Sequence, residues 1–518
     1  MAGTFLIGEK KDRPGVYFRR ENYGGPDVVG ATNGIGAAIF QADWGPMNKV
    51  YDLDLTMKND IADYFGSDPH VKILREMFDG GAITIRAIRC GDDDGVASSV
   101  TLKATNMPVT VEAGAGAGTA SGGGVDLDDD EEAIVGGAGA AVVSDSTPVD
   151  AVTITAAYPG ARSFTVSLRT NLITEMRECI IYDGTVIFEK VTFEAGENEV
   201  ANLITALNKS KNFIAKAVGG VIPDGPLVTV TQVPMTGGKN PTVTAASYDR
   251  ATNQLERVKW NCLIVDTDDA GIHALVQSFV DLSYEMGHFG FGCIAGLSTQ
   301  DLDERMSLAA SYNDEKMAYL LNGWKSNSGV VYDGYLGAAR IGGLIASFET
   351  NASITHEVIK SALTLLEPLT NGEIIKALRK GCLVLSLNDS DQIWVEAGIN
   401  TLVTPDADMD EGWKKLRRTK CRFELMDRVN STCDKLVGKI NNDVDGRQTV
   451  MAAAQKVLNT MAGEKKILAT SYVYEDPANP AEGDSAWFKL AIDDIDSLEH
   501  IYLTYQFRFS AVDDTATA

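Results

Sequence analysis

The chain has 518 residues, which at roughly 150 residues per domain suggests about three domains. Its 44% hydrophobic and 23% charged residues are typical of folded soluble proteins and exclude disorder along the whole chain. The net charge of −26 disfavours binding to nucleic acid and contact with anionic membranes. There is no apolar run of about 18 residues and no secretory signal, so we expect a chain that is made in a cytoplasm.

Residues 1–30 are predicted to form an extended arm. Prolines and glycines break any helix there, and Val16, Tyr17 and Phe18 form strands readily but have no partner nearby in the sequence. Such an arm buries too little surface to fold alone. We therefore expect these three residues to pair with a neighbouring subunit by adding a strand to its sheet.

An α/β core domain is predicted from residues 31–96 and 241–400. In the first part, helical patterns at Asp52–Phe65 and Pro69–Phe78 precede a strand at Ala82–Ile88. In the second part we expect helices at Tyr248–Val258, Ala270–Met286, Leu302–Tyr312, Tyr335–Ser347 and Ile374–Arg379. We expect strands at Trp260–Asp266, Phe289–Ala295 and Met317–Leu321, and a hairpin formed by Leu383–Leu387 and Gln392–Val395. This alternation is typical of an open sheet with helices on both faces.

Residues 97–240 are predicted to be a mostly β domain inserted into the core domain and facing outward. Short strand patterns recur, and Asp183-Gly184 fits a two-residue hairpin turn. The glycine-rich and acidic stretch at 113–139 indicates a surface loop. A calcium site formed by its acidic run is the less favoured alternative.

Residues 401–518 are predicted to form an α+β domain with helices at 412–440 and 450–461 and a strand at 486–492. The chain closes with a strand, at residues 501–509, in which apolar and polar side chains alternate strictly. Its apolar face consists of Ile501, Leu503, Tyr505, Phe507 and Phe509. We expect a final strand with such an apolar face to pair either within its own sheet or with another chain.

A basic run opens the long helix of this domain. Six of nine residues are cations, namely Lys414, Lys415, Arg417, Arg418, Lys420 and Arg422. Placing cations at a helix N-terminus opposes the helix dipole, which suggests a partner for them. Two interpretations remain open: a solvated or intersubunit cluster, or recognition of an acidic protein surface.

The sequence lacks the motifs that are typical of catalytic, cofactor-binding and metal-binding sites. Gly237-Gly238-Lys239 lacks the first glycine and the hydroxyl of a phosphate-binding loop, and Asn441–Gly446 lacks the later glutamate of an EF-hand. The five histidines show no ligand spacing, and the seven cysteines are scattered. We therefore expect no catalytic residue, no cofactor and no metal.

An ordered set of short motifs runs along the chain. They are Arg13-Pro14-Gly15-Val16-Tyr17, Trp44-Gly45-Pro46, Val152–Gly160, Thr236-Gly237-Gly238, Tyr335–Gly343, Ile399-Asn400-Thr401-Leu402 and Asn442–Arg447. In this order they resemble the tail sheath proteins of contractile bacteriophages and phage-tail-like bacteriocins, in the form common in phages of Gram-positive bacteria.

The resemblance implies a structural protein, not an enzyme. Sheath subunits form stacked hexameric rings around a tail tube and contract to drive the tube through a bacterial envelope. Their terminal arms complete a shared sheet in the C-terminal domain, which holds the inner, tube-facing elements. The implied partners are further copies of the chain, the tube protein, and baseplate and tail terminator proteins. The implied location is the virion tail, after assembly in the host cytoplasm.

Two alternatives stay open. The chain is either a phage sheath subunit or the sheath subunit of a bacteriocin or another contractile injection system. From a different class, an α/β enzyme with an unrecognised site remains the alternative.

We predict that replacing residues 113–139 with a short Gly/Ser linker leaves assembly intact, because surface loops tolerate such changes. Electron micrographs of the purified variant test this. Loss of sheath formation in the variant alone would show that the loop contributes to subunit contacts.

Overall fold

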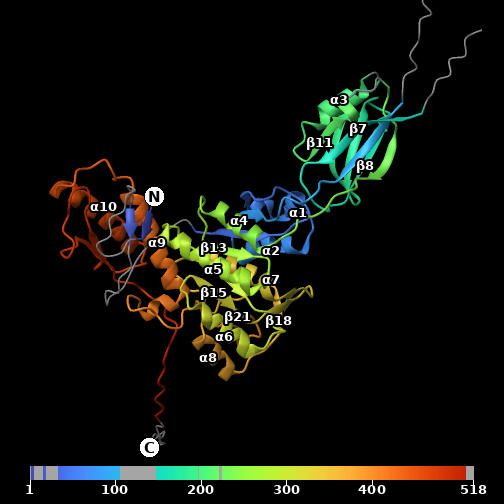
Figure 1. Ribbon diagram of the computed structural model, residues 1–518. Coiled ribbons are helices and arrows are strands. Elements are labelled where there is room, and N and C mark those ends of the chain that lie inside the picture. Colours follow the sequence, from blue (N-terminus) through green and yellow to red (C-terminus); the bar gives the residue numbers. More distant parts are fainter. Residues whose placement is uncertain are drawn as a thin grey trace, which may run out of the picture. The chain divides into compact units, whose positions relative to one another are not determined.

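A computed structural model describes residues 2–4, 16–18, 33–105, 147–196, 198–220 and 225–508. The chain divides into two compact units (Figure 1). The core unit comprises residues 1–42, 46–92 and 243–518, and the inserted unit comprises residues 43–45 and 93–242. The predicted fold class, an α/β core sheet with an inserted mostly β domain and an α+β C-terminal part, is confirmed.

The core unit is built on a seven-stranded sheet with the order β19-β15-β14-β13-β3-β5-β4. All neighbours are parallel except β4, which pairs antiparallel with β5 at one edge. The strands are β3 (Ile35–Phe40), β4 (Tyr51–Asp54), β5 (Thr84–Arg89), β13 (Cys262–Val265), β14 (Phe291–Ala295), β15 (Met317–Leu320) and β19 (Cys382–Leu383). The central strands are buried and apolar, as expected for a parallel sheet covered on both faces.

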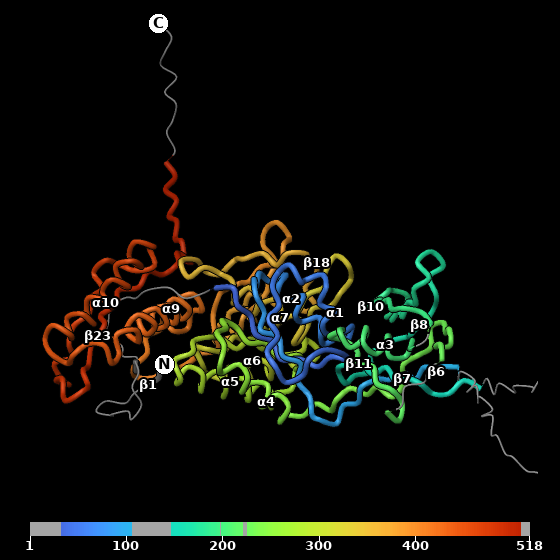
Figure 2. The backbone as a smooth tube through the Cα atoms, turned by 90° about the horizontal axis from the view of Figure 1, so that it is seen from above, coloured from blue at the N-terminus to red at the C-terminus, as the bar shows by residue number. Residues whose placement is uncertain are grey.

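Helices cover both faces of this sheet (Figure 2). One face packs against α1 (Ile61–Phe65), α2 (Lys72–Gly80) and α7 (Gly334–Ser347). The other face packs against α4 (Ala245–Leu255), α5 (Ala270–Glu285), α6 (Leu302–Tyr312) and α8 (Asn371–Arg379). Side chains of β3 alternate between these two cores: Ala38 and Phe40 lie in one, Ala37 and Ile39 in the other.

Two small sheets complete the central part of the core unit. One joins β16 (Trp324–Ser326) to β17 (Val331–Tyr332) and β18 (Ala362–Leu365). The other is the antiparallel hairpin of β20 (Leu385–Leu387) and β21 (Ile393–Val395), which the sequence predicted. Leu385, Ile393 and Val395 are buried in the same core as α2 and α7, so the hairpin is part of the body of the unit.

One predicted helix is partly wrong. Residues 51–54 form the edge strand β4, followed by a 3-10 turn at Leu55–Asn59 and the short α1. Pairing of β4 with β5 satisfies main-chain groups of β5 that would otherwise lie open at the sheet edge. This tertiary pairing overrides the local helical pattern.

Helices α2 and α7 approach each other at glycines. A Cβ added to Gly343 would collide with the carbonyl oxygen of Met77, and one added to Gly80 would collide with that of Arg340. The same interface buries an ion pair, in which Arg340 Nε donates to Glu76 Oε2 over 3.0 Å. The small residues of α7 therefore allow a close approach that larger side chains would prevent.

We predict that Gly343→Ala destabilises the protein by about 1–3 kcal/mol, because the methyl group forces α7 away from α2. Gly463→Ala is the control, since its Cβ meets nothing within 4 Å and the change stays within about 0.5 kcal/mol. Urea unfolding followed by tryptophan fluorescence measures both. Equal unfolding midpoints for the two variants would contradict the close packing.

The C-terminal part of the core unit combines α9 (Leu416–Cys433), α10 (Val444–Gly463) and a hairpin of β22 (Tyr472–Glu475) with β23 (Phe488–Ala491). Leu425, Leu458, Met461 and Ile467 form a small core of their own. The long helix predicted at 412–440 is therefore too long at both ends. Lys415 forms a β-bridge with Ile399, which delays the helix start, and a positive φ of 71° at Gly438 marks the turn that follows it.

The N-terminal strands β1 (Ala2–Thr4) and β2 (Val16–Phe18) pair with each other in parallel. The prediction that Val16–Phe18 has no local partner is therefore wrong for its main chain. Strand β1 lies beside α5, and β2 lies beside α9.

The inserted unit contains two antiparallel sheets around one core, with the strand orders β10-β9-β8-β12 and β11-β7-β6. Its elements are β6 (Ser99–Ala104), β7 (Val149–Ala156), β8 (Phe164–Thr170), β9 (Arg177–Asp183), β10 (Val186–Phe193), α3 (Glu199–Leu207), β11 (Phe213–Ala217) and β12 (Val230–Pro234). Trp44 lies at its centre, with its ring 4.9 Å from that of Phe164. The predicted loop at 113–139 lies outside the described residues.

Candidate functional site

Among the core-unit residues whose burial is described, the C-terminal arm, residues 500–508, is the most exposed apolar segment. The exposed fractions are 94% for Phe507, 72% for Tyr505 and 69% for Leu503. Residues 501–508 form no hydrogen-bonded strand within the chain, and they run away from the folded part of the unit (Figures 1 and 2). The predicted strand at 501–509 is thus not formed in the single subunit, and Phe509 lies outside the described residues. An alternating segment of this kind is suited to pair with another chain.

The hairpin β22–β23 offers an edge for such pairing. It is a two-stranded sheet, and isolated sheets of this size are marginally stable. The outer edge of β22 lies beside α10, where the Val473 amide donates to Gln455 Oε1 over 3.1 Å. Strand β23 forms the other side of this two-stranded sheet, so each strand of the hairpin has one edge that faces away from its partner strand.

The cations of the basic run lie against acidic groups of their own subunit. Arg418 Nε and Arg422 Nη2 lie 2.6 and 3.0 Å from the buried Asp494 carboxylate. Lys415 Nζ lies 2.7 Å from Asp496 and 3.1 Å from Glu499. Burial lowers the pKa of Lys415, but these two carboxylates outweigh it and hold the pKa above its ordinary value.

The remaining cations of the run are placed differently. Lys414 pairs with the exposed Glu411 over 2.7 Å. Arg417 is 3% exposed and lies 4.0 Å from Asp496. Lys420 points into the body, where its Nζ donates to the carbonyl oxygens of Ile345, Ala346 and Phe348 and to Asn33 Oδ1, at 2.7–3.1 Å.

These positions correct the interpretation of the run as a set of exposed cations facing a partner. Arg417, Lys420 and Arg422 are buried, and acidic residues near the C-terminus contact four of the six cations, namely Lys415, Arg417, Arg418 and Arg422. Sequence reasoning missed this because Asp494, Asp496 and Glu499 are about 80 residues away in the chain. Of the six, Lys414 and Lys415 keep side chains that are 31% and 28% exposed, so tube binding stays a prediction for these two.

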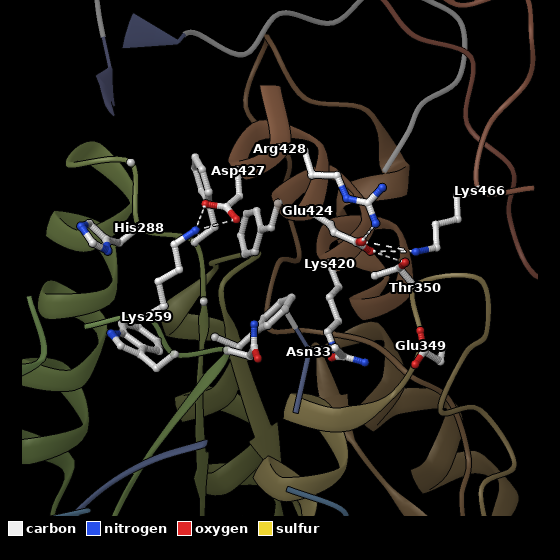
Figure 3. Close-up of a pocket in the computed structure, with 17 residues that line it drawn as sticks. Asn33, Lys259, His288, Glu349, Thr350, Lys420, Glu424, Asp427, Arg428 and Lys466 are labelled. Atoms are coloured by element: carbon white, nitrogen blue, oxygen red, sulfur yellow. Dashed lines mark hydrogen bonds and ion pairs between the residues drawn. The ribbon is translucent and has the colours of Figure 1, made fainter. Parts of the chain in front are cut away.

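A cavity of about 320 Å³ lies where α9 meets the core sheet (Figure 3). Charged side chains on its wall pair with one another: Lys259 Nζ is 2.6 Å from Asp427, and Glu424 is 3.1 Å from Arg428 and 3.3 Å from Lys466. Burial lowers the pKa of Lys420 to about 7, whereas its four oxygen acceptors favour the ammonium form. The cavity wall thus holds α9 against the core through its own ion pairs.

The carboxyl edge of the parallel sheet is where an α/β enzyme would carry its site. Here β13 and β5 flank β3 on opposite sides, which is the arrangement that opens a ligand crevice in other α/β proteins. In this chain Asp266, directly after β13, is fully buried and accepts from Tyr248 Oη at 2.6 Å and from the Gln41 amide at 2.8 Å. Its remaining contact is His70 Nδ1 at 2.9 Å. The donors that surround Asp266 belong to the chain itself, which favours a packing role for this edge.

Stability should depend on the His70–Asp266 pair. Hydrogen bonding to Asp266 raises the pKa of His70 to about 8, above its ordinary 6.5. The pair therefore stabilises fully below about pH 6.5, and its contribution is lost as the pH rises through 8. Because the His70 side chain is 32% exposed, solvent screening limits the effect to about 1 kcal/mol.

We predict that His70→Gln removes this loss of stability between pH 6 and pH 9, because the variant has no titrating group beside Asp266. The control is His500→Gln, which changes an exposed histidine of the C-terminal arm. Thermal unfolding of both variants across the pH range measures the effect. A wild-type slope retained in His70→Gln would contradict it.

Two further observations concern the described ranges only. No described helix is long and apolar enough to cross a membrane. The described side chains include no group of three or more His, Cys, Asp or Glu residues placed to hold a metal ion.

Comparison with known proteins shows which proteins this chain is similar to. Residues 242–401 match the family described as phage tail sheath protein central domain. The structure is similar to the sheath tail protein of Desulfitobacterium hafniense, with 18% identity, a TM-score of 0.62, and coverage of 93% of this chain and 100% of the other. It is also similar to a sheath tail protein of Listeria innocua, with 18% identity, a TM-score of 0.63, and coverage of 92% and 97%.

A third similar structure is the contracted helical sheath of the anti-feeding prophage, with 10% identity, a TM-score of 0.50, and coverage of 96% of this chain and 99% of the other. No curated protein matches the sequence. The chain therefore has the fold of sheath tail proteins and carries their central domain. The predicted resemblance to contractile tail sheath proteins is confirmed.

Proposed function

We propose that this chain is the structural subunit of a contractile tail sheath. It polymerises as stacked hexameric rings around a tail tube and contracts to drive the tube through a bacterial envelope. The observation that carries the proposal is the C-terminal arm, whose apolar face is exposed in a subunit with the sheath fold. An enzyme needs no such arm, and the polar groups around Asp266 at the sheet edge are occupied by donors of the chain.

Strand addition is the means by which subunits join. The arm of one subunit adds to an edge of the two-stranded β22–β23 hairpin of another. Each main-chain hydrogen bond so formed contributes about 0.5–1.5 kcal/mol net, and burial of the aromatic side chains adds to this. The residues proposed to exchange are Val16, Tyr17, Phe18, Ile501, Leu503, Tyr505, Phe507 and Phe509.

Further partners follow from the same proposal. The C-terminal part faces the tail tube, and Lys414 and Lys415 are candidates for contact with an acidic tube surface. Baseplate and tail terminator proteins bind the two ends of the sheath, and the inserted unit faces outward. The particle is a phage virion tail assembled in the host cytoplasm, or alternatively a phage-tail-like bacteriocin or another contractile injection system.

We predict that the triple variant Leu503→Ser, Tyr505→Ser and Phe507→Ser stays folded but no longer forms sheaths, because the arm loses its apolar face. The matched control changes Thr504, Gln506 and Arg508, on the opposite face of the same segment, to serine and keeps assembly. Sedimentation and electron microscopy of the purified proteins measure both. Normal sheaths from the apolar-face variant would overturn strand exchange by this arm.

The N-terminal arm is tested in the same assay. Deleting residues 1–25 should leave a folded monomer, because β1 and β2 pair only with each other in their sheet. Sheaths of normal length from this truncated chain would show that the N-terminal arm is dispensable.

A further inference from the structure

The root of the C-terminal arm is held to the core unit in two different ways. Up to Asp494 the chain is anchored by its main chain: Ile467 and Asp494 form a β-bridge, and the Leu468 amide donates to Asp493 O over 2.9 Å. For residues 495–508, all of which the structure describes, hydrogen bonds and ion pairs to the body come only from the side chains of Asp496 and Glu499. The path of residues 495–499 therefore depends on side-chain contacts.

Lys415 is the common partner of these two acids. Its Nζ lies 2.7 Å from Asp496 Oδ2 and 3.1 Å from Glu499 Oε2. Glu499 also accepts from Thr355 Oγ1 over 3.1 Å, and its side chain is only 14% exposed. Residues 500–508 are exposed, so Glu499 is the last anchored point of the described residues.

About one and two helical turns after Lys415, Arg418 and Arg422 contact the preceding acid, Asp494. Both guanidinium groups contact Asp494, whose side chain is 3% exposed. Asp410 joins them from the loop before α9, with Arg422 Nη1 3.1 Å from its carboxylate. The charges of Arg418 and Arg422 are thus balanced by the carboxylates of Asp494 and Asp410. Together with the Lys415 contacts, these ion pairs hold the segment before the arm against α9.

The cationic side of this contact is fixed to the core. The Leu416 amide donates to Gly398 O over 3.0 Å, and the Asn400 amide donates to Lys414 O over 3.1 Å. Asn400 is fully buried, and its Nδ2 donates to Trp413 O over 2.6 Å. The start of α9 is thus a rigid base against which the arm root is held.

We propose that Lys415, Arg418 and Arg422, with Asp494, Asp496 and Glu499, form a clamp that fixes where and in which direction the C-terminal arm leaves the core unit. Its role in presenting the arm to a second copy of this chain rests on the proposed function. Without the clamp, five more residues would join the free tether, adding about 17 Å of extended reach. A longer tether lowers the effective concentration of the arm at its acceptor.

Backbone ¹⁵N relaxation of the isolated full chain tests the clamp without any assembly. In Lys415→Gln, the order parameters of residues 495–499 should fall from the value of rigid backbone, about 0.85, to below about 0.6, because the side-chain contacts that fix this segment are weakened. The control is Lys414→Gln, which removes only the pair with the 77% exposed Glu411. Unchanged order parameters at 495–499 in Lys415→Gln would overturn the clamp.

Salt gives a second readout. The order parameters at 495–499 should fall with added sodium chloride in the wild type, because Lys415 and Asp496 are 28% and 33% exposed and are screened. In Lys415→Gln this dependence should be largely lost. An equal salt dependence in both proteins would overturn the assignment to this ion pair, and thermal unfolding of the variant checks that the fold is intact.

Assembly then tests the second part of the proposal. The concentration of subunit needed to form sheaths should rise about three- to tenfold in Lys415→Gln, in proportion to the lower effective concentration of the arm. Lower order parameters with an unchanged assembly threshold would overturn the role in presenting the arm. If the apolar-face arm variant still assembles, strand exchange itself is wrong, while the relaxation result for the isolated subunit is unaffected.

Discussion

The main-chain groups and apolar side chains of the C-terminal arm require a partner, and the described part of the subunit does not supply one. Every second side chain of the arm is apolar, and these side chains share one face and are at least 67% exposed, namely Ile501, Leu503, Tyr505 and Phe507. At the same time, the β22–β23 hairpin is a sheet of only two strands. The chain thus contains an arm that is not paired in a sheet and a two-stranded hairpin to which a strand can add. This combination favours exchange of arms between copies of the chain. The rest of the core unit holds the arm and the hairpin in place for this exchange.

Helix α9 connects the presented elements to the sheet. Leu416 and Phe423 belong to the main core with α2 and α7, whereas Leu425 belongs to the small core beneath the hairpin. Buried polar contacts reinforce this connection, since Lys420 holds the carbonyl oxygens at the end of α7. The ends of other helices are capped by ordinary side chains, such as Asp269 at the start of α5. The core unit is therefore one body in which the sheet, the hairpin and the arm root are joined.

Sequence periodicity predicted much of this fold because the core helices have one buried face. The predicted helix at Leu302–Tyr312 and the hairpin near residues 385–395 are confirmed. Predictions failed where a distant partner decides the local structure. Strand β4 forms because β5 offers an edge, and α9 begins late because Lys415 bridges to Ile399. Neither partner is visible in a local window of sequence.

Distant partners also limited what the sequence could predict about the charged residues. A run of six cations suggested a partner outside the subunit, but Asp494 and Asp496 lie against it in the folded chain. The alternating pattern of the arm was readable from sequence because it requires no knowledge of what lies nearby. Local patterns thus predicted the candidate strand, while the contacts that hold its root required the structure.

The central claim is that this chain builds a polymer through its own arms. Electron microscopy of the purified full-length protein tests it most directly. Our account predicts long helical tubes whose subunits are joined by density that continues from residue 499 of one copy to the β22–β23 hairpin of another. Small closed oligomers at all concentrations, or tubes in which the arm folds back on its own subunit, would contradict it.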